Sequence, residues 1–354
     1  MSKNEIGYVM NHTISVCIPS YNYKNYLSRA IESVLSQTFQ NFELIIVDDA
    51  STDSSGELIK EYAEKNAKIK YIRNERNVGM AKNWNKCISL ARGKYMSILH
   101  ADDVYLPSNL EVESKILENN LDVGMVFSAN YEINADGKII HINKPFRKSK
   151  IFEGEKFVEQ IIKRGNFVRF PSVMIRKKCL NEIGLFDESL NLTVDIEMWM
   201  RIGSFYKIAY ISQPLALYRV HGLNESFKSL SAGKGILETY RALKRLFYNT
   251  KISKSRREKL NYLMENSLVN RALSLSYFYT LLKWGGKKAV RKALEDSFKI
   301  NKKVKKSWRF LIIKFLLRFN ERYLLKILDI LSRAKRFVPV IKLHFDMKIS
   351  EKYK

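Results

Sequence analysis

The chain has 354 residues, with 46% hydrophobic and 12% aromatic residues, which excludes a disordered protein and allows one large domain plus an appendage. Its formal net charge of +26 is concentrated in residues 225–354, which hold 33 Lys or Arg against 10 Asp or Glu. Residues 1–224 hold 29 basic against 26 acidic side chains, so anionic partners are expected at the C-terminal region.

No segment predicts a membrane span or a secretion signal. The N-terminal stretch MSKNEIGYVMNHT lacks the apolar core of a signal peptide, and the apolar run FLIIKFLLRF is interrupted by Lys314 and Arg318. Cys17, Cys87 and Cys179 are too widely spaced for a zinc site and odd in number for a disulfide framework. We therefore expect buried reduced thiols and a cytoplasmic location.

The N-terminal part of the chain alternates short apolar runs with amphipathic helical patterns. Strands are expected at residues 14–18, 42–49, 68–74 and 94–103. The stretches between them, NYLSRAIESVLSQ, ASTDSSGELIKEYAEKN and GMAKNWNKCISLA, have the spacing and caps of helices. This alternation predicts an α/β fold with a doubly wound, mostly parallel sheet.

Three of these strands end in polar sequences, namely PSYN, DDAST and HADD. In doubly wound sheets, ligands bind beyond the carboxyl ends of the strands, so the three sequences indicate a nucleotide-sized pocket at one edge. The adjacent carboxylates of Asp102 and Asp103 repel each other. They are either solvated turn residues or ligands of a divalent cation, which prefers oxygen. Asp48 and Asp53 are interpreted as structural, with Asp53 as a helix cap.

Further along, residues 123–131 predict another strand, and INADGKII predicts a hairpin with an Asp-Gly turn. The segment VRFPSVMIRKKCLNEIGLFDES combines a short strand with a helix, and LTVDIEMWMRIGS begins a helix. From about residue 229 onward, Gly and Pro are rare, while Lys, Arg, Leu and aromatic residues dominate. The C-terminal region is therefore expected to be mainly α-helical and basic.

Within this region, residues 308–331 predict an amphipathic helix. Basic side chains recur at every fourth position and form one face: Lys314, Arg318, Arg322 and Lys326. Bulky apolar side chains form the other side: Phe310, Ile313, Leu317, Leu324 and Leu328. The helix either packs on the N-terminal part of the chain with its charges in water or lies in the interface of an anionic membrane. Nucleic acid is a third anionic candidate, but the broad apolar face favours the membrane.

Five motifs together resemble family 2 glycosyltransferases of the GT-A fold. They are ISVCIPSYNYKNYLSRAIESVLSQTFQNFELIIVDDASTD, RNVGMAKNWN, GKYMSILHADD, VDIEMWMRI and YRVHGLNES, in the order and spacing of that family. The resemblance covers roughly residues 13–225. It implies an N-terminal extension at 1–12, a GT-A glycosyltransferase domain at 13–225 and a basic helical region at 226–354.

The resemblance also implies roles for residues of the donor site. Pro19, Tyr21 and Asp49 match the nucleotide-base pocket, where Tyr21 would flank a uracil and Asp49 would accept its N3–H. Lys82 and Asn83 match the segment that approaches the diphosphate.

Further roles concern the cation and the acceptor. Asp102 and Asp103 match the acidic motif that holds Mg²⁺ or Mn²⁺ through the donor's phosphates, and His221 matches a histidine near the metal. His100 stands where many relatives have an acidic residue. Asp195 matches the catalytic base of inverting members, with Glu197 as its competitor.

The expected activity is transfer of a sugar, with inversion, from a nucleoside-diphosphate sugar such as a UDP-sugar to a glycan or lipid-linked acceptor. We expect a hexosyltransferase of bacterial cell-surface polysaccharide synthesis, peripherally bound to the inner face of the cell membrane. One alternative is a nucleotidyltransferase acting on sugar phosphates, although PSYNYKNY lacks its Gly-rich or basic phosphate loop. The other is a non-catalytic membrane scaffold, which would be expected to lose Asp195 or the pair Asp102 and Asp103.

Overall fold

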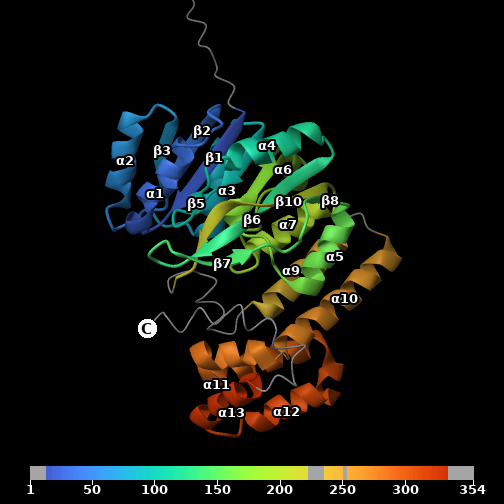
Figure 1. Cartoon of the computed structure of the whole chain (residues 1–354). Coiled ribbons are helices and arrows are strands. Elements are labelled where there is room, and N and C mark those ends of the chain that lie inside the picture. Colours follow the sequence, from blue (N-terminus) through green and yellow to red (C-terminus); the bar gives the residue numbers. More distant parts are fainter. Residues whose placement is uncertain (1–12, 222–234, 250–252, 274, 334–354) are drawn as a thin grey trace, which may run out of the picture.

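The computed structural model describes residues 13–221, 235–249, 253–273 and 275–333. The expected N-terminal extension and the last residues of the YRVHGLNES motif lie outside this range. The sheet and the helices packed on it form the upper part of the molecule in Figure 1, and helices α11, α12 and α13 form the lower end. None of the described helices is both long and apolar enough to cross a lipid bilayer.

The described strands form one sheet of ten strands in the order β3-β2-β1-β4-β9-β6-β10-β5, with β7 beside β6 and β8 beside β10. The strand bounds are β1 Ile14–Ser20, β2 Phe42–Asp48, β3 Ile69–Arg73, β4 Tyr95–Ile98, β5 Val104–Tyr105, β6 Val123–Ile133, β7 Ile139–Asn143, β8 Lys150–Phe152, β9 Val173–Arg176 and β10 Lys207–Arg219. Strands β3, β2, β1 and β4 are parallel, as are β6 and β10, whereas β9 runs antiparallel between β4 and β6. The predicted doubly wound, mostly parallel sheet and the predicted hairpin of β6 and β7 are confirmed.

Helices cover both faces of the sheet. Their bounds are α1 Lys24–Leu35, α2 Ser55–Lys65, α3 Met80–Leu90, α4 Asn109–Asn119, α5 Gly154–Arg164, α6 Lys177–Ile183, α7 Val194–Gly203, α9 Ile236–Asn249, α10 Lys254–Ala272, α11 Leu275–Ile300, α12 Trp308–Leu316 and α13 Glu321–Arg333, with short 3₁₀ helices at Phe170–Ser172 and Lys302–Lys306. Successive strand residues point to opposite faces, so Val16 and Ile18 pack with α1, α2 and α4, while Cys17 packs with α3, α5 and α7. The sheet is thus buried on both sides.

The C-terminal helices continue the hydrophobic core of the catalytic part. One cluster of buried side chains runs from Trp199 of α7 through Leu243 of α9 and Met264 of α10 to Ala293 of α11 and Ile313 of α12. The predicted helical character of this region is confirmed. Its first helices therefore belong to the packed body of the protein.

The prediction of one helix across residues 308–331 is wrong. Helix α12 ends at Leu316, and α13 begins at Glu321. Between them Asn320 accepts a 3.0 Å hydrogen bond at Oδ1 from the Arg322 N–H, which favours a new helix start. Lys314 and Arg318 therefore do not share a helix face with Arg322 and Lys326.

The apolar side expected to face a membrane faces the protein instead. Ile313, Leu317 and Leu324 are buried, and Phe310 is partly buried against the same core. The side chain of Leu328 lies outside the described residues.

Candidate active site

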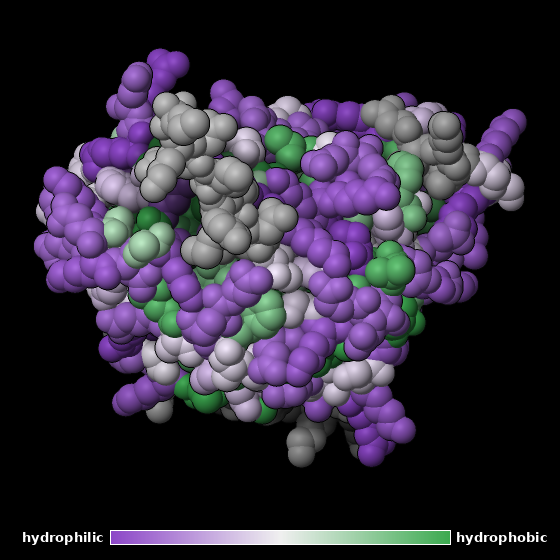
Figure 2. All heavy atoms as spheres, turned by 90° about the horizontal axis from the view of Figure 1, so that it is seen from above, coloured by the Kyte–Doolittle hydropathy of each residue, from purple (hydrophilic) through white to green (hydrophobic). Residues whose placement is uncertain are grey.

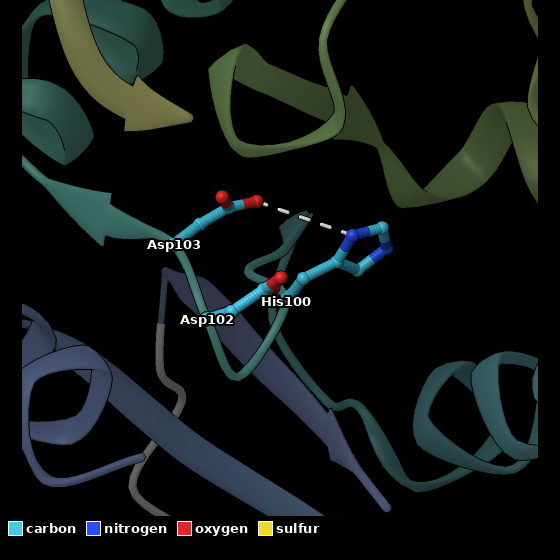
Figure 3. A group of neighbouring side chains, drawn as sticks. All are labelled: His100, Asp102 and Asp103. Carbon is cyan, nitrogen blue, oxygen red and sulfur yellow. Dashed lines mark ion pairs between the residues drawn. The ribbon is translucent and has the colours of Figure 1, made fainter. Parts of the chain in front are cut away.

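Asp102 and Asp103 lie on a tight turn between β4 and β5. The turn closes when the Asp103 N–H donates a 3.0 Å hydrogen bond to the His100 carbonyl. Both carboxylates are buried, and one ligand atom each of His100, Asp102 and Asp103 lies within 4.8 Å of the others (Figure 3). The solvated-turn interpretation is therefore wrong, because a solvated pair would be exposed.

The end of β10 holds this turn in place. The Arg219 N–H donates to Asp103 Oδ1 at 2.8 Å, and Arg219 Nε donates to the Asp102 carbonyl at 2.8 Å. His221 Nε2 lies 3.0 Å from Asp102 Oδ2, which places this predicted residue at the pair. Arg219 was missed at the sequence level, although it lies in the YRVHGLNES motif two residues before His221.

A cation fits this cluster. Asp103 Oδ2 is buried and accepts no hydrogen bond from the part of the chain that the structure describes. Burial and the neighbouring Asp102 carboxylate raise the pKa of Asp103 well above its usual range. A buried carboxylate oxygen without a donor is costly, and a divalent ion satisfies it. His100 Nδ1 lies 4.0 Å from this oxygen, and burial lowers the pKa of His100, so the ring favours its neutral, ligand-competent form.

Asp49 is buried at the end of β2 and organises the loop before α3. Its Oδ1 accepts hydrogen bonds from Asn74 Nδ2 at 2.7 Å and from the Val78 N–H at 2.9 Å. Its Oδ2 accepts one from the Gly79 N–H at 3.0 Å, which leaves that oxygen able to accept another. Tyr21 follows β1 directly and is 44% exposed. The carbonyl of its neighbour Ser20 accepts a 2.8 Å hydrogen bond from the Asp49 N–H.

Two other aspartates near this edge have structural partners, as the sequence analysis expected. Asp48 accepts from Arg73 Nη1 at 2.7 Å and also binds Ser51. Asp53 Oδ2 accepts from the Lys24 N–H at 3.0 Å, at the start of α1, and its Oδ1 accepts from the Ser55 N–H at 3.1 Å, at the start of α2. Asp53 is not the N-cap residue of either helix, but its carboxylate satisfies the first backbone N–H of both.

Lys82 and Asn83 are neighbours on α3 but differ in environment. Lys82 is exposed. Asn83 is buried, donates from Nδ2 to the Val47 carbonyl at 3.1 Å and accepts from Asn74 at 3.1 Å. Both ends of its amide thus have a partner inside the protein, and Asn83 helps to hold the loop that Asp49 also holds.

Asp195 lies in the first turn of α7, half-buried. Its Oδ2 accepts a 2.7 Å hydrogen bond from Asn166 Nδ2, and its Oδ1 accepts one of 2.7 Å from the Ile196 N–H. Burial raises the pKa of Asp195 to about 6, while these hydrogen bonds and Arg169 lower it. A carboxylate with a pKa near neutrality suits a general base. Asn166 was missed at the sequence level, since nothing local marks it.

Glu197, the competing carboxylate, is held in an ion pair. Arg201 Nε and Nη2 donate to its two oxygens at 2.9 and 2.8 Å, and Arg201 also donates to the carbonyls of Ile183 and Leu185. Both carboxylate oxygens of Glu197 are therefore engaged by one guanidinium inside the protein. The geometry therefore favours Asp195.

The charge of Arg169 acts on both Asp103 and Asp195. It pairs with Glu132 at 3.2 Å, and its guanidinium lies 5.3 Å from the Tyr218 ring centroid. Its charge lowers the pKa of both Asp103 and Asp195. Both carboxylates therefore lie in the field of one cation that the sequence did not single out.

Comparison with known proteins identifies the class of this chain. The family model for glycosyl transferase family 2 matches residues 15–183. An uncharacterised glycosyltransferase, MJ1057, of Methanocaldococcus jannaschii is 35% identical over 249 residues, which cover 70% of this chain and 83% of the relative. The chain belongs to family 2 of the glycosyltransferases, and it is a glycosyltransferase.

One further relative and one solved structure add to this comparison. Chondroitin synthase of Escherichia coli is 28% identical over 223 residues, which cover 62% of this chain but 31% of that protein. The crystal structure of S. aureus TarS 1-349 in complex with UDP-GlcNAc superposes with a TM-score of 0.62 at 17% identity, covering 84% of this chain and 91% of that one. This likeness concerns the fold, and it confirms the predicted GT-A architecture.

Proposed function

We propose that this chain is an inverting hexosyltransferase. It transfers a sugar from a nucleoside-diphosphate sugar, with UDP as the favoured nucleotide, to a hydroxyl of a glycan or lipid-linked acceptor. The observation that carries this proposal is the buried pair Asp102 and Asp103. Asp103 Oδ2 accepts no hydrogen bond from the described residues. Such a pair suits the cation that accompanies a diphosphate.

The donor site that we propose follows the sheet edge. Pro19 and Tyr21 flank the nucleotide base. Asp49 Oδ2, which can accept a further hydrogen bond, accepts one from an N–H of the base. Lys82 supplies positive charge to the diphosphate, and Asn83 shapes the loop beneath it. The UDP and UDP-GlcNAc complexes of TarS, which shares the fold, support a uridine nucleotide.

Asp102 and Asp103, together with His100 or His221, would hold Mg²⁺ or Mn²⁺. When bound, the ion neutralises the negative charge that develops on the diphosphate. His221 already contacts Asp102, so it is placed either to ligate the ion or to orient that carboxylate.

The proposed reaction is a single displacement. Asp195 removes the proton from the acceptor hydroxyl, whose oxygen attacks the anomeric carbon as the bond from that carbon to the diphosphate oxygen breaks. Asn166 holds the Asp195 carboxylate in one orientation. The sugar inverts its configuration, and the proton remains on Asp195 until it is released to solvent.

The acceptor and location that we propose are a cell-surface polysaccharide or its lipid-linked precursor, at the inner face of a bacterial cell membrane. The likeness to chondroitin synthase supports a polysaccharide. The excess of basic residues in 225–354 supports an anionic surface near the enzyme. Family membership leaves the nucleotidyltransferase alternative without support, and the scaffold alternative is addressed by the following experiment.

The test is a screen of sugar nucleotides against the full chain, with Mn²⁺ or Mg²⁺ and with EDTA. Binding is measured by calorimetry and donor hydrolysis by nucleotide release. We expect cation-dependent binding of UDP and slow hydrolysis of one UDP-sugar. A chain that binds UDP but hydrolyses no sugar nucleotide, alone or with glycan acceptors, would instead be a non-catalytic scaffold.

A further inference from the structure

Helix α12 and the turn after it carry apolar side chains on two sides. One side, with Ile313 and Leu317, is buried in the protein core. The other side exposes four residues, which we call the α12 surface: Leu311 at 55%, Ile312 at 43%, Phe315 at 55% and Phe319 at 39% exposure. The rings of Phe315 and Phe319 lie edge to face with centroids 5.3 Å apart. An exposed apolar cluster of this kind is typical of an interaction site.

The surroundings of the α12 surface are strongly basic. Residues 301–327 contain nine Lys or Arg and one acidic residue, Glu321. Glu321 already accepts a 2.9 Å hydrogen bond from the Lys287 N–H. Eight of the nine basic side chains are exposed, including Lys314 and Arg318. The partner of the α12 surface must therefore be both apolar and anionic.

The position of the surface is consistent with docking from one end of the molecule. Helix α12 lies at the lower end in Figure 1. The opposite end, seen from above in Figure 2, is dominated by hydrophilic residues with scattered hydrophobic ones.

We propose that the α12 surface inserts its apolar side chains into the headgroup region of an anionic lipid bilayer, while the surrounding lysines and arginines contact lipid phosphates. This inference rests on the proposed function, because a membrane-held enzyme stays beside a lipid-linked acceptor. It also replaces the residues expected to face the membrane: Leu311, Ile312, Phe315 and Phe319 take the place of Ile313, Leu317 and Leu324.

Two other occupants fit less well. Nucleic acid offers phosphates, but Leu311 and Ile312 have no aromatic plane on which bases stack. A second copy of the same surface would bring two groups of nine basic residues together, which repel each other. Of these three occupants, the anionic bilayer is the one that matches both the apolar and the basic side chains of the α12 surface.

The experiment measures co-sedimentation of the full chain with vesicles of phosphatidylcholine, with and without about one third phosphatidylglycerol. The apolar variant is Leu311→Ser with Phe315→Ser. Its control is Leu121→Ser with Phe205→Ser, which are 77% and 55% exposed on the catalytic part. The charge variant is Lys314→Glu with Arg318→Glu, and its control is Arg147→Glu with Lys148→Glu, two exposed basic residues.

We expect the wild type to pellet with the anionic vesicles and less at high salt, and both α12 variants to bind about tenfold more weakly than their controls. Equal pelleting of the apolar variant and the wild type would overturn the proposal, as would equal loss in the controls. Tighter binding to single-stranded RNA than to vesicles would assign the surface to nucleic acid. A wild-type dimer that the apolar variant dissociates would assign it to a second copy.

Calorimetry with UDP and Mn²⁺ on the same variants separates this proposal from the enzymatic one. We expect all four variants to bind UDP like the wild type, because none touches the donor site. An α12 variant that loses vesicle binding but still binds UDP would show that the α12 surface binds lipid and that the donor site is unaffected. A wild type that pellets with vesicles but binds no sugar nucleotide would overturn the proposed enzyme while the lipid-binding surface stands.

Discussion

Asn166 donates a 2.7 Å hydrogen bond from Nδ2 to Oδ2 of Asp195, joining the loop after α5 to the first turn of α7. Burial raises the pKa of Asp195 to about 6, and this bond opposes the increase by favouring the charged carboxylate. The proposed base, Asp195, is thereby kept ionised near neutral pH. The hydrogen bond makes Asn166 a positioning residue with a measurable effect on pH dependence.

Asn166→Ala should raise the pKa of Asp195 further, because the carboxylate loses a donor. The base works only when ionised, so the acid limb of the kcat/KM profile should move to higher pH. Activity should then fall several-fold more at pH 6 than at pH 8. The measurement is a pH profile of transfer, with Asn41→Ala as an exposed control. An equal loss at all pH values would mean that Asn166 serves folding alone.

Asp195→Asn and Glu197→Gln should differ in kind. We expect Asp195→Asn to bind the UDP-sugar normally and to lose about 10²- to 10⁴-fold in transfer, since only the proton acceptor is removed. Glu197→Gln should retain chemistry but lower the midpoint of thermal unfolding, because Arg201 loses its partner. Donor binding by calorimetry, transfer rates and melting curves are compared. The reverse pattern would make Glu197 the base.

Asp103→Ala should abolish turnover and weaken binding of UDP with Mn²⁺, while the fold persists because the residue lies in a turn at a strand end. Calorimetry with UDP, with and without Mn²⁺, measures this effect, and circular dichroism checks the fold. Asp53→Ala, which removes the acceptor for the first N–H of α1 and of α2, should lower stability without changing the cation dependence. Unchanged cation-dependent affinity in Asp103→Ala would refute the assignment of the pair.

Glu113 offers a test of stability against pH. It is fully buried, burial raises its pKa well above the usual range, and its main donor is Ser128 Oγ at 3.0 Å. The folded state thus holds a proton that the unfolded chain releases at lower pH, so the free energy of unfolding falls as pH rises from the unfolded pKa toward the folded one. Glu113→Gln removes this dependence.

We therefore expect Glu113→Gln to melt about 2–5 °C higher than the wild type at pH 8 and to differ less at pH 5. Glu75→Gln, a change at an exposed residue, is the control. Melting curves between these pH values provide the measurement. A lower melting point for Glu113→Gln at pH 8 would mean that the ionised carboxylate has a stabilising partner.

The family resemblance, the sheet and the sheet edge that carries the acidic pair follow from local features of the sequence. Short apolar runs ending in PSYN, DDAST and HADD are local signals, and parallel strands bring their carboxyl ends to one edge whatever the details of packing. The adjacent Asp102 and Asp103 are visible in the same way. Local spacing was sufficient for these features because each depends on residues close together in the chain.

Which acidic and basic groups lie together depends on tertiary packing. Arg201, one helical turn from Glu197, binds both of its oxygens, and the sequence spacing alone did not determine that geometry. Asn166 and Arg169 come from a loop far from Asp195 and Asp103, so their contribution depends on long-range packing. The break between α12 and α13, in contrast, lies at Asn320, which accepts a hydrogen bond from the nearby Arg322 N–H. Ile313 and Leu317 are buried against the core, so the opposite apolar side of α12 remains exposed. Helical periodicity shows that α12 has two apolar sides, but it does not show which of them the protein covers.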